Sequence, residues 1–307
     1  MQLSENKTRS LELQNIFRDY ISNYEMSFAV IDLNQKNSNG NTEIFGYNLD
    51  HFIYPASVYK VFIGAEVLRQ VELGPLKLDQ KITIQSPNDV DQDAWIFPGD
   101  TRKLLYEGDS VTIDYLLDLM LIRSDNTASN TLIDLVTRES ITENIIYRYG
   151  WHGSEVTRKF LDRKKDEKYQ FSQTTLSCVR HLAEFMYRIE TGTLISSWVS
   201  EQLRTYMNNW NRDGRGGLNL SEYKNYYRKG GWLETNLWKL TTIPSLIKSL
   251  IKRKWGVIQW SNDIGVVTGE QSHYVVVLMS VNKKVFPNRP FPIQDFARRL
   301  YKYMKGK

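Results

Sequence analysis

The stretch Ser57–Glu72, SVYKVFIGAEVLRQVE, follows a proline by two residues and predicts a helix that begins at about Ser57. Its apolar face runs through Val61, Phe62, Ala65 and Leu68. Residues three apart are neighbours on a helix, so the amine of Lys60 can reach the hydroxyl of Ser57. A serine is weakly nucleophilic until a base removes its proton, and a lysine with a lowered pKa can be that base. The stretch therefore predicts a helix with a candidate nucleophile and base at its N-terminus.

The segments on either side of this helix have clear periodicity. Residues 10–24 show helical spacing of apolar side chains, and the run MSFAVIDL at 26–33 predicts a buried strand. Turn residues at 34–41 then lead to a second strand near 42–47, which makes a hairpin. The middle of the chain predicts helices at 113–122, 127–137, 141–149, 175–190 and 196–210. Strands follow at 223–230, 255–267 and 273–281, and an amphipathic helix follows at 293–304.

This order of elements predicts an α/β (α+β) fold. The outer strands pair into one antiparallel sheet that is flanked by the terminal helices, and the helical block between them is an inserted all-helical lobe. We expect residues 1–56 and 213–307 to form the α/β subdomain and residues 57–212 to form the helical subdomain. Clefts between two such lobes are where small-molecule sites usually lie.

Two further motifs accompany the Ser57–Lys60 pair. Ser124-Asp125-Asn126 lies between two predicted helices, and Lys229-Gly230-Gly231 ends the predicted strand YKNYYRKGG. Each motif has an ordinary interpretation when it is taken alone: a serine N-cap with a solvated lysine, an Asx or Ser turn, and a bulge or turn at the glycines. Their order along one chain favours a shared site.

The order S-x-x-K, then S-D-N, then K-[T or S]-G resembles the signature of class A β-lactamases and penicillin-binding proteins. The resemblance extends over nearly the whole chain. Supporting matches are the run SDNTASN at 124–130, the pair Thr174-Thr175 and the strand SNDIGVV at 261–267. The serine-dependent glutaminases share the fold and the S-x-x-K motif, but their middle motif differs, so they rank lower. The resemblance implies a β-lactamase/transpeptidase-like fold.

The resemblance also implies a role for each residue of the three motifs. Ser57 attacks an amide or lactam carbonyl, and Lys60 takes its proton directly or through water. Ser124 relays a proton to the leaving nitrogen. Asn126 holds the side-chain amide of the substrate and helps to fix Lys60. Lys229 supports the relay electrostatically and attracts the substrate carboxylate.

Further contacts follow from the same resemblance. The backbone N–H groups of Ser57 and Trp232 hold the oxyanion, each donor contributing about 3 kcal/mol. Gly230 and Gly231 allow a ligand to approach the strand closely. Gly230 replaces the usual hydroxyl residue, which removes a hydrogen bond of about 1–3 kcal/mol to a buried carboxylate. Arg215 stands where some relatives place a carboxylate-binding arginine, with Arg212 and Arg228 nearby.

One motif of class A hydrolases is missing. Their Glu-x-x-Leu-Asn carries the glutamate that activates the deacylating water, and no such motif exists between residues 155 and 175. The candidates by residue type, in a loop that is charged throughout, are Glu155, Asp162, Asp166 and Glu167. Acylation is therefore better supported than rapid deacylation.

Three functions remain open at this point. The first is a hydrolase that acts on a β-lactam or related amide through an acyl-serine intermediate. The second is a biosynthetic or cell-wall acyltransferase or peptidase on the same scaffold, in which another nucleophile replaces water. The third is a β-lactam sensor or binding protein that turns over slowly.

Two segments are expected to border the site or to lie outside the family pattern. The stretch 86–108, with Trp95 and Phe97, is expected to wall the cleft opposite the lysine-glycine strand. The insertion 233–254 has an apolar and a basic face, and it fits a helix packed on its own protein, a flap, a dimer contact or a membrane-surface helix.

The composition argues against several other kinds of partner and site. The net charge of +5 comes without a basic stripe or a nucleic-acid-reading motif, so the expected partner is a small amide, lactam or peptide substrate and not nucleic acid. The single Cys178 excludes an internal disulfide, and no G-x-S-x-G elbow supports a Ser-His-Asp triad. No metal or other cofactor is predicted, because ligand spacing is absent among His51, His152, His181 and His273.

The N-terminal residues suggest a location. They are polar and lack the apolar core of a secretory signal, and no run is long enough to span a membrane. The chain as written is therefore expected to be cytoplasmic, or periplasmic or extracellular if a leader has been removed. The sequence leaves the oligomeric state open.

Overall fold

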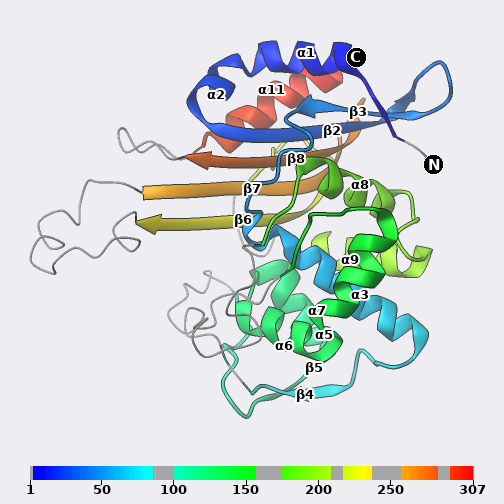
Figure 1. Ribbon diagram of the computed structural model, residues 1–307, viewed down its shortest axis with the longest axis vertical. Helices are drawn as coiled ribbons and strands as arrows, with labels where there is room; N and C mark the ends of the chain where they lie inside the picture. The colour runs from blue at the N-terminus through cyan, green and yellow to red at the C-terminus, as the bar shows by residue number, and fades with distance from the viewer. Residues whose placement is uncertain are drawn as a thin grey trace, which may run out of the picture.

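A sheet forms one layer of the molecule, with helices packed against both of its faces (Figure 1). The computed structural model describes residues 3–85, 87, 100–156, 175–208, 217–236, 257–282 and 291–306. The strands of the sheet are β1 (Ser4–Glu5), β2 (Glu25–Lys36), β3 (Thr42–Tyr47), β6 (Asn225–Asn236), β7 (Val257–Thr268) and β8 (His273–Asn282). Within the described residues they pair in the order β1-β3-β2-β8-β7-β6, and all pairs except β1 with β3 are antiparallel. The predicted antiparallel sheet is confirmed, and β6 lies at its edge.

The central strand β2 is buried on both faces. Phe28 and Val30 pack in the apolar cluster beneath the terminal helices, whereas Ala29 and Ile31 pack in the cluster on the opposite face. Side chains alternate between the two faces of a strand, so a strand covered on both sides is apolar at most positions. This explains the continuous apolar run MSFAVIDL in the sequence.

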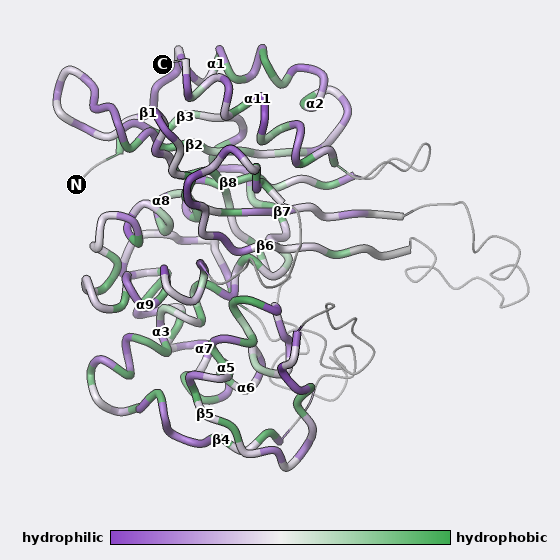
Figure 2. Tube along the Cα trace, turned by 180° about the vertical axis from the view of Figure 1, so that it is seen from behind, coloured by the Kyte–Doolittle hydropathy of each residue, from purple (hydrophilic) through white to green (hydrophobic). Residues whose placement is uncertain are grey.

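Terminal helices cover the outer face of the sheet. They are α1 (Lys7–Ile16), α2 (Arg18–Asn23) and α11 (Ile293–Lys305). Phe17 stacks on Phe296 with 4.3 Å between ring centroids, which joins the two ends of the chain. Figure 2 shows both hydrophilic and hydrophobic residues along α1 and α11, as expected for helices with one buried face. The buried ion pair Arg9–Asp32, with 2.8 Å between Nη1 and Oδ2, lies under this layer.

The other face of the sheet packs against the helical part of the chain. Its elements are η1 (Ala56–Tyr59), α3 (Lys60–Leu73), β4 (Lys81–Thr83), β5 (Ser110–Thr112), α5 (Ile113–Asp118), η2 (Leu119–Arg123), α6 (Asn126–Val136), α7 (Arg138–Ile141), η3 (Thr142–Ile146), η4 (Tyr147–Tyr149), α8 (Val179–Glu190) and α9 (Ser197–Asn208). The helix α3 is the core of this part, because every residue from Lys60 to Leu68 is buried. Among the described residues, no helix combines the length and apolarity needed to cross a membrane.

The structure differs from the predicted elements at several points. The short strands β1, β4 and β5 were not predicted, and β4 and β5 pair with each other inside the inserted lobe, which was predicted to be all helical. The strand β6 continues to Asn236, so Lys229-Gly230-Gly231 lies inside the strand and does not end it. Residues 175–178 are extended and not helical, because Ser177 pairs with Ile53 in an isolated bridge, and α8 therefore begins only at Val179. The predicted helices 113–122 and 141–149 contain π and 3-10 turns. The division into subdomains at 56/57 and 212/213 stays a prediction.

Candidate active site

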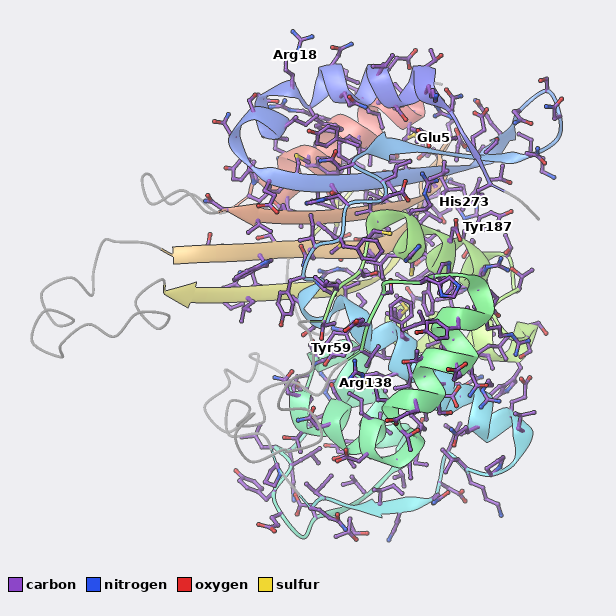
Figure 3. The ribbon with its side chains drawn as sticks, viewed as in Figure 1. Glu5, Arg18, Tyr59, Arg138, Tyr187 and His273 are labelled. Carbon is purple, nitrogen blue, oxygen red and sulfur yellow. The ribbon has the colours of Figure 1, made fainter. Side chains whose placement is uncertain are left out.

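Ser57 stands where the chain enters α3. It is half-buried, whereas its neighbour Tyr59 is fully buried, and Figure 3 shows Tyr59 at the level where the sheet meets the helical part. The Lys60 N–H donates back to the Ser57 carbonyl within this 3-10 turn. Ala56 has a φ of +49°, a left-handed conformation that costs a non-glycine residue about 1–3 kcal/mol. The backbone is thus strained directly before the candidate nucleophile.

Lys60 connects the first motif to the second. Its side chain is fully buried in the first turn of α3. The Nζ donates to the Ser124 carbonyl at 2.5 Å, to Asn126 Oδ1 at 2.9 Å and to the Asp125 carbonyl at 3.2 Å. A further contact of 3.4 Å reaches Ser124 Oγ. Burial of a polar group is unfavourable unless polar partners replace water, so these acceptors hold the lysine side chain in place.

The backbone conformation of the Ser124-Asp125-Asn126 turn explains its contacts with Lys60. Ser124 adopts a φ of +65° between η2 and α6. Asp125 caps α6, because its Oδ1 accepts the N–H of Ala128 at 2.8 Å. The left-handed residue and the cap together direct two backbone carbonyls and the Asn126 amide toward Lys60.

Lys229 brings the third motif to the same point. It is 2% exposed, and its Nζ donates to Ser124 Oγ at 2.9 Å and to the Gly230 carbonyl at 3.1 Å. Ser124 Oγ is therefore contacted by the side chains of both Lys60 and Lys229. The structure brings together Lys60, Ser124, Asn126 and Lys229 from segments that are far apart in the sequence. Ser57 belongs to the turn that precedes Lys60, and the contact of its hydroxyl with Lys60 stays a prediction.

Gly231 allows β6 to approach the turn that leads into α3. A Cβ on Gly231 would lie 2.5 Å from the Pro55 carbonyl oxygen and 2.9 Å from the Ser57 nitrogen, which leaves no room for a side chain. The next residue, Trp232, is 62% exposed. The proposed oxyanion donors, the N–H groups of Ser57 and Trp232, thus belong to two segments in close contact, and their role stays a prediction.

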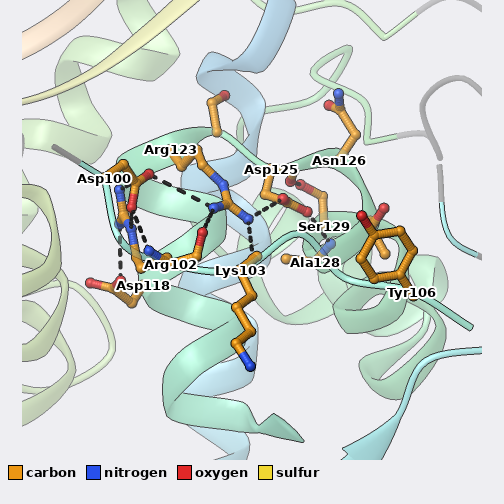
Figure 4. A network of polar contacts seen from close by, with 12 residues as sticks. Asp100, Arg102, Lys103, Tyr106, Asp118, Arg123, Asp125, Asn126, Ala128 and Ser129 are labelled. Carbon is orange, nitrogen blue, oxygen red and sulfur yellow. Dashed lines mark hydrogen bonds and ion pairs between the residues drawn. The ribbon is translucent and has the colours of Figure 1, made fainter. Parts of the chain in front are cut away.

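Arg123 joins the Ser124 turn to the segment before β5 (Figure 4). Its guanidinium donates to the carbonyls of Arg102 at 2.8 Å and Lys103 at 3.0 Å, and Nη2 donates to Asp125 Oδ2 at 2.9 Å. Arg102 in turn pairs with Asp100 at 2.7 Å. These contacts hold the turn in addition to those made by Lys60.

The same network has an electrostatic consequence at Asp100. Burial alone would raise the pKa of Asp100, but hydrogen bonds from Arg102 and the charges of Arg102 and Arg123 outweigh it, so the pKa is lowered. The carboxylate stays charged and keeps both arginines in position. Sequence reasoning missed this network, because nothing in the local spacing pairs Arg123 with residues twenty positions earlier.

Asn262 is a second residue that the sequence did not indicate. It is buried in β7, and its Nδ2 donates to the Tyr54 carbonyl at 3.0 Å while its Oδ1 accepts the Ser280 N–H at 3.0 Å. The side chain thereby links the sheet to the segment that leads into Ser57. It lies within the SNDIGVV run, which gave the only available signal.

The described residues on either side of positions 157–174 contact one another directly. The N–H of Glu155 donates to the Leu176 carbonyl at 2.8 Å, and Ser154 Oγ lies 2.9 Å from both Ser177 Oγ and His181 Nδ1. Glu155, one candidate for water activation, forms an ion pair of 3.6 Å with Arg138. The other predicted candidates and wall residues, Trp95, Phe97, Asp162, Asp166, Glu167, Thr174, Arg212 and Arg215, lie outside the described residues. Of the predicted insertion, residues 233–236 belong to β6 and 237–254 lie outside the described residues.

This junction predicts a loss of stability in acid. Burial lowers the pKa of His181 from 6.5 to about 4. The unfolded state then binds the proton more tightly, so the free energy of unfolding decreases as the pH falls below about 6.5, by about 2 kcal/mol near pH 4.5. Urea denaturation of the wild type and His181→Gln between pH 7.5 and 4.5 measures this contribution. Identical pH slopes for the two proteins would contradict the assignment.

The described residues contain no group of three or more His, Cys, Asp or Glu side chains that could hold a metal ion. The chemistry available at the site is that of a serine hydroxyl, two buried lysine side chains and backbone donors. This set suits acyl transfer, in which a nucleophile attacks a carbonyl and a proton moves to the leaving group.

Sequence comparison indicates a family. The family model described as the beta-lactamase enzyme family matches residues 9–304. The extended-spectrum beta-lactamase PER-1 of Pseudomonas aeruginosa is 28% identical over 153 residues, which are 49% of this chain and 47% of that protein. The aligned stretch thus spans about half the length of this curated relative.

Solved structures with the same fold cover nearly the whole chain. The TLA-1 extended-spectrum beta-lactamase has a TM-score of 0.72 at 16% identity, covering 96% of this chain and 99% of that one. PBP-A has a TM-score of 0.69 at 18% identity, covering 100% and 99%, and a point variant of it was solved as its acyl-enzyme complex with penicillin G. The beta-lactamase of Sphaerobacter thermophilus has a TM-score of 0.67 at 18% identity, covering 97% of each chain. At these identities the likeness confirms the β-lactamase/transpeptidase-like fold.

Proposed function

The chain belongs to the beta-lactamase enzyme family, and on that premise we propose that it is a serine hydrolase that opens a β-lactam, or cleaves a related amide, through an acyl-enzyme on Ser57. The observation that carries the proposal is the meeting of Lys60 and Lys229 at Ser124 Oγ, next to the segment that bears Ser57. A hydroxyl that contacts two amines can take a proton from one group and pass its own proton to another. Acyl transfer needs such a path from the nucleophile to the leaving nitrogen.

The proposed acylation moves one proton and exchanges one bond. Ser57 Oγ attacks the carbonyl carbon while its proton passes to Lys60, and the developing oxyanion accepts hydrogen bonds from the N–H groups of Ser57 and Trp232. The carbon–nitrogen bond then breaks. Ser124 delivers its proton to the leaving nitrogen and takes one from Lys60. Lys60 thereby gives up the proton that it took from Ser57, so that no net charge is created.

Asn126 and Lys229 are proposed to position the substrate. The Asn126 amide accepts from Lys60 through Oδ1, and its Nδ2 is a donor of the kind that suits an acyl-side-chain carbonyl of the substrate. Lys229 supplies positive charge beside Ser124 and attracts an anionic substrate. The net charge of +5 is consistent with an anionic ligand.

Release of the acyl group is the step with the least support from the sequence. No Glu-x-x-Leu-Asn precedes the Thr174-Thr175 pair. This absence favours, as a second candidate function, a protein that acylates and then passes the acyl group to an amine or keeps it. The acyl-enzyme of the PBP-A variant with penicillin G makes that compound a suitable first probe.

Intact-protein mass spectrometry over time after addition of benzylpenicillin tests the proposal. We expect a mass increase of one whole penicillin molecule, because ring opening loses no atoms, and peptide mapping is expected to locate it on Ser57. Penicillin that has been hydrolysed beforehand is the control and should give no adduct. An adduct that clears in buffer supports the hydrolase.

The other outcomes separate the alternatives. An adduct that clears only after an amine such as glycinamide is added indicates an acyltransferase. One that persists with and without the amine indicates a sensor. No adduct at any penicillin concentration, or an adduct mapped to another residue, would overturn acylation of Ser57 by β-lactams.

A further inference from the structure

The two proposed oxyanion donors lie on different segments of the chain, so their relative position depends on what holds those segments together. The N–H of Ser57 belongs to η1, and the N–H of Trp232 belongs to β6. Gly231 lies against the Ser57 nitrogen, since a Cβ there would be 2.9 Å from it. Ala56, directly before Ser57, is left-handed, and such a conformation persists only when surrounding contacts maintain it. Two donors stabilise one oxyanion only if both are directed at the same point.

Asn262 of β7 contacts both segments. Its backbone pairs with Gly231 of β6, and its Nδ2 donates to the Tyr54 carbonyl at 3.0 Å, three residues before Ser57. Figure 1 shows β6 and β7 side by side, at the edge of the sheet nearest the helical part. The ring of Trp260, two residues earlier on the same face of β7, lies against the Tyr54 ring with 5.7 Å between centroids. Tyr54 is thus held by β7 at its backbone and at its side chain.

The neighbours of the Asn262 amide determine its orientation. Its Oδ1 accepts the Ser280 N–H at 3.0 Å, and a backbone N–H can only donate. The Tyr54 carbonyl can only accept, so Nδ2 must face it. Asn262 is 3% exposed, which means that both ends of its amide are used inside the protein. A side chain without one donor and one acceptor at these positions could not make both contacts.

The sheet itself is interrupted at this residue. Within the described strands, β7 pairs with β8 on both sides of Ser261 and Asn262, but not at these two residues. Ser280 fills the interruption, because its N–H donates to Asn262 Oδ1 and its Oγ donates to the Ser261 carbonyl at 2.8 Å. Side-chain atoms therefore replace backbone pairing at the point of β7 that lies opposite Gly231 and Trp232. Local departures from regular structure concentrate at functional sites.

We propose that Asn262 is a positioning residue for acylation. It holds the segment before Ser57 against the edge of the sheet, so that the N–H groups of Ser57 and Trp232 are directed at the same oxyanion. The inference rests on the proposed function. Asn262 does not touch the substrate in this scheme, and it acts through the backbone of the two segments that it joins.

The carbonyl stretch of the acyl-enzyme tests this role, because hydrogen bonds to a carbonyl oxygen weaken the C=O bond and lower its frequency. The protein is mixed with benzylpenicillin that carries ¹³C at the lactam carbonyl, and infrared difference spectra are recorded during a single turnover. Asn262→Leu has the same branched shape but makes neither contact. We expect its ester band to move to higher frequency and its acylation rate to fall by about 10- to 100-fold.

Binding of the substrate before acylation should be nearly unaffected. In a Ser57→Ala background, addition of Asn262→Leu should change the dissociation constant of benzylpenicillin by less than about threefold, because the oxyanion forms only after attack. Calorimetry measures this constant. If Asn262→Leu does not fold, Asn262→Ala carries the same expectations with a smaller side chain.

The matched control is Ser280→Ala. It removes the hydrogen bond from Ser280 Oγ to the Ser261 carbonyl in the same interruption of the sheet, but it leaves the contact between Asn262 and Tyr54 in place. It should lower the melting temperature as Asn262→Leu does, while the ester band and the acylation rate stay at their wild-type values.

Two results would overturn the positioning role while acylation of Ser57 still stands. One is an ester band at the wild-type frequency in the Asn262 variants. The other is an equal movement of the band in Ser280→Ala, because general loosening of the sheet would then explain it. A wild-type protein that forms no adduct would instead remove the proposed function, and the positioning role with it.

Discussion

Ser57→Ala is expected to abolish the covalent adduct with benzylpenicillin and to lower any hydrolysis rate by about 10⁴-fold or more, because no other group replaces the attacking oxygen. Alanine loses one oxygen atom at a half-buried position, so the free energy of unfolding should change by less than about 1 kcal/mol. Stopped-flow mixing with a chromogenic cephalosporin measures the hydrolysis rate, and intact-protein mass spectrometry measures the adduct.

A matched serine makes this result specific. Ser221 is exposed in the turn before β6, and Ser221→Ala should acylate at the wild-type rate. If Ser57→Ala still formed an adduct at more than about one hundredth of the wild-type rate, another residue would be the nucleophile and the proposed acyl-enzyme would be wrong. A loss of the adduct together with unfolding would be visible in the thermal melt and would require Ser57→Gly in its place.

Lys60→Met is expected to lower the acylation rate by about 10³-fold, the size of effect that is usual for loss of a positioned general base. Methionine fills most of the volume but cannot take the proton of Ser57. The rising limb of the pH–rate profile of acylation should disappear in the variant if Lys60 is the base. Single-turnover kinetics between pH 5.5 and 9 measure both the rate and the profile.

This substitution also carries a structural cost. The carbonyls of Ser124 and Asp125 and the Asn126 amide lose a buried donor, which destabilises the protein by about 1–3 kcal/mol. Rates are therefore compared at a temperature where the melts show both proteins folded, with the exposed lysine variant Lys81→Met as the control. A Lys60→Met protein that keeps more than about one tenth of the acylation rate, with an unchanged pH profile, would exclude Lys60 as the base.

The network around Arg123 explains how contacts from two different segments hold the Ser124 turn. Lys60 contacts the turn from α3, and Arg123 ties it to the carbonyls of Arg102 and Lys103. A left-handed serine is costly, and contacts on both sides keep it in that conformation. Arg123, which has no chemical role in the proposed acyl transfer, therefore helps to determine where Ser124 Oγ lies.

The local patterns of the sequence were sufficient for most elements. The hairpin strand at 42–47 was predicted with its observed bounds, because the turn residues at 34–41 that precede it are a local signal. The start of α8 was predicted too early, because Ser177 forms a β-bridge with Ile53, which lies more than one hundred residues earlier in the chain. The end of β6 was also misplaced, because two glycines suggest a turn unless a neighbouring strand continues beside them.

By itself, then, the sequence determined the order of helices and strands and the chemical groups of the candidate site, since periodicity and three-residue spacing operate within a few turns of backbone. Only the tertiary structure decided which of those groups meet. Lys229 reaches Ser124 across a separation of 105 residues, and Arg228 occupies the space beside Gly230 because Asp263 of the neighbouring strand holds it there. Such contacts depend on how distant segments pack, and packing between distant segments leaves no local pattern in the chain.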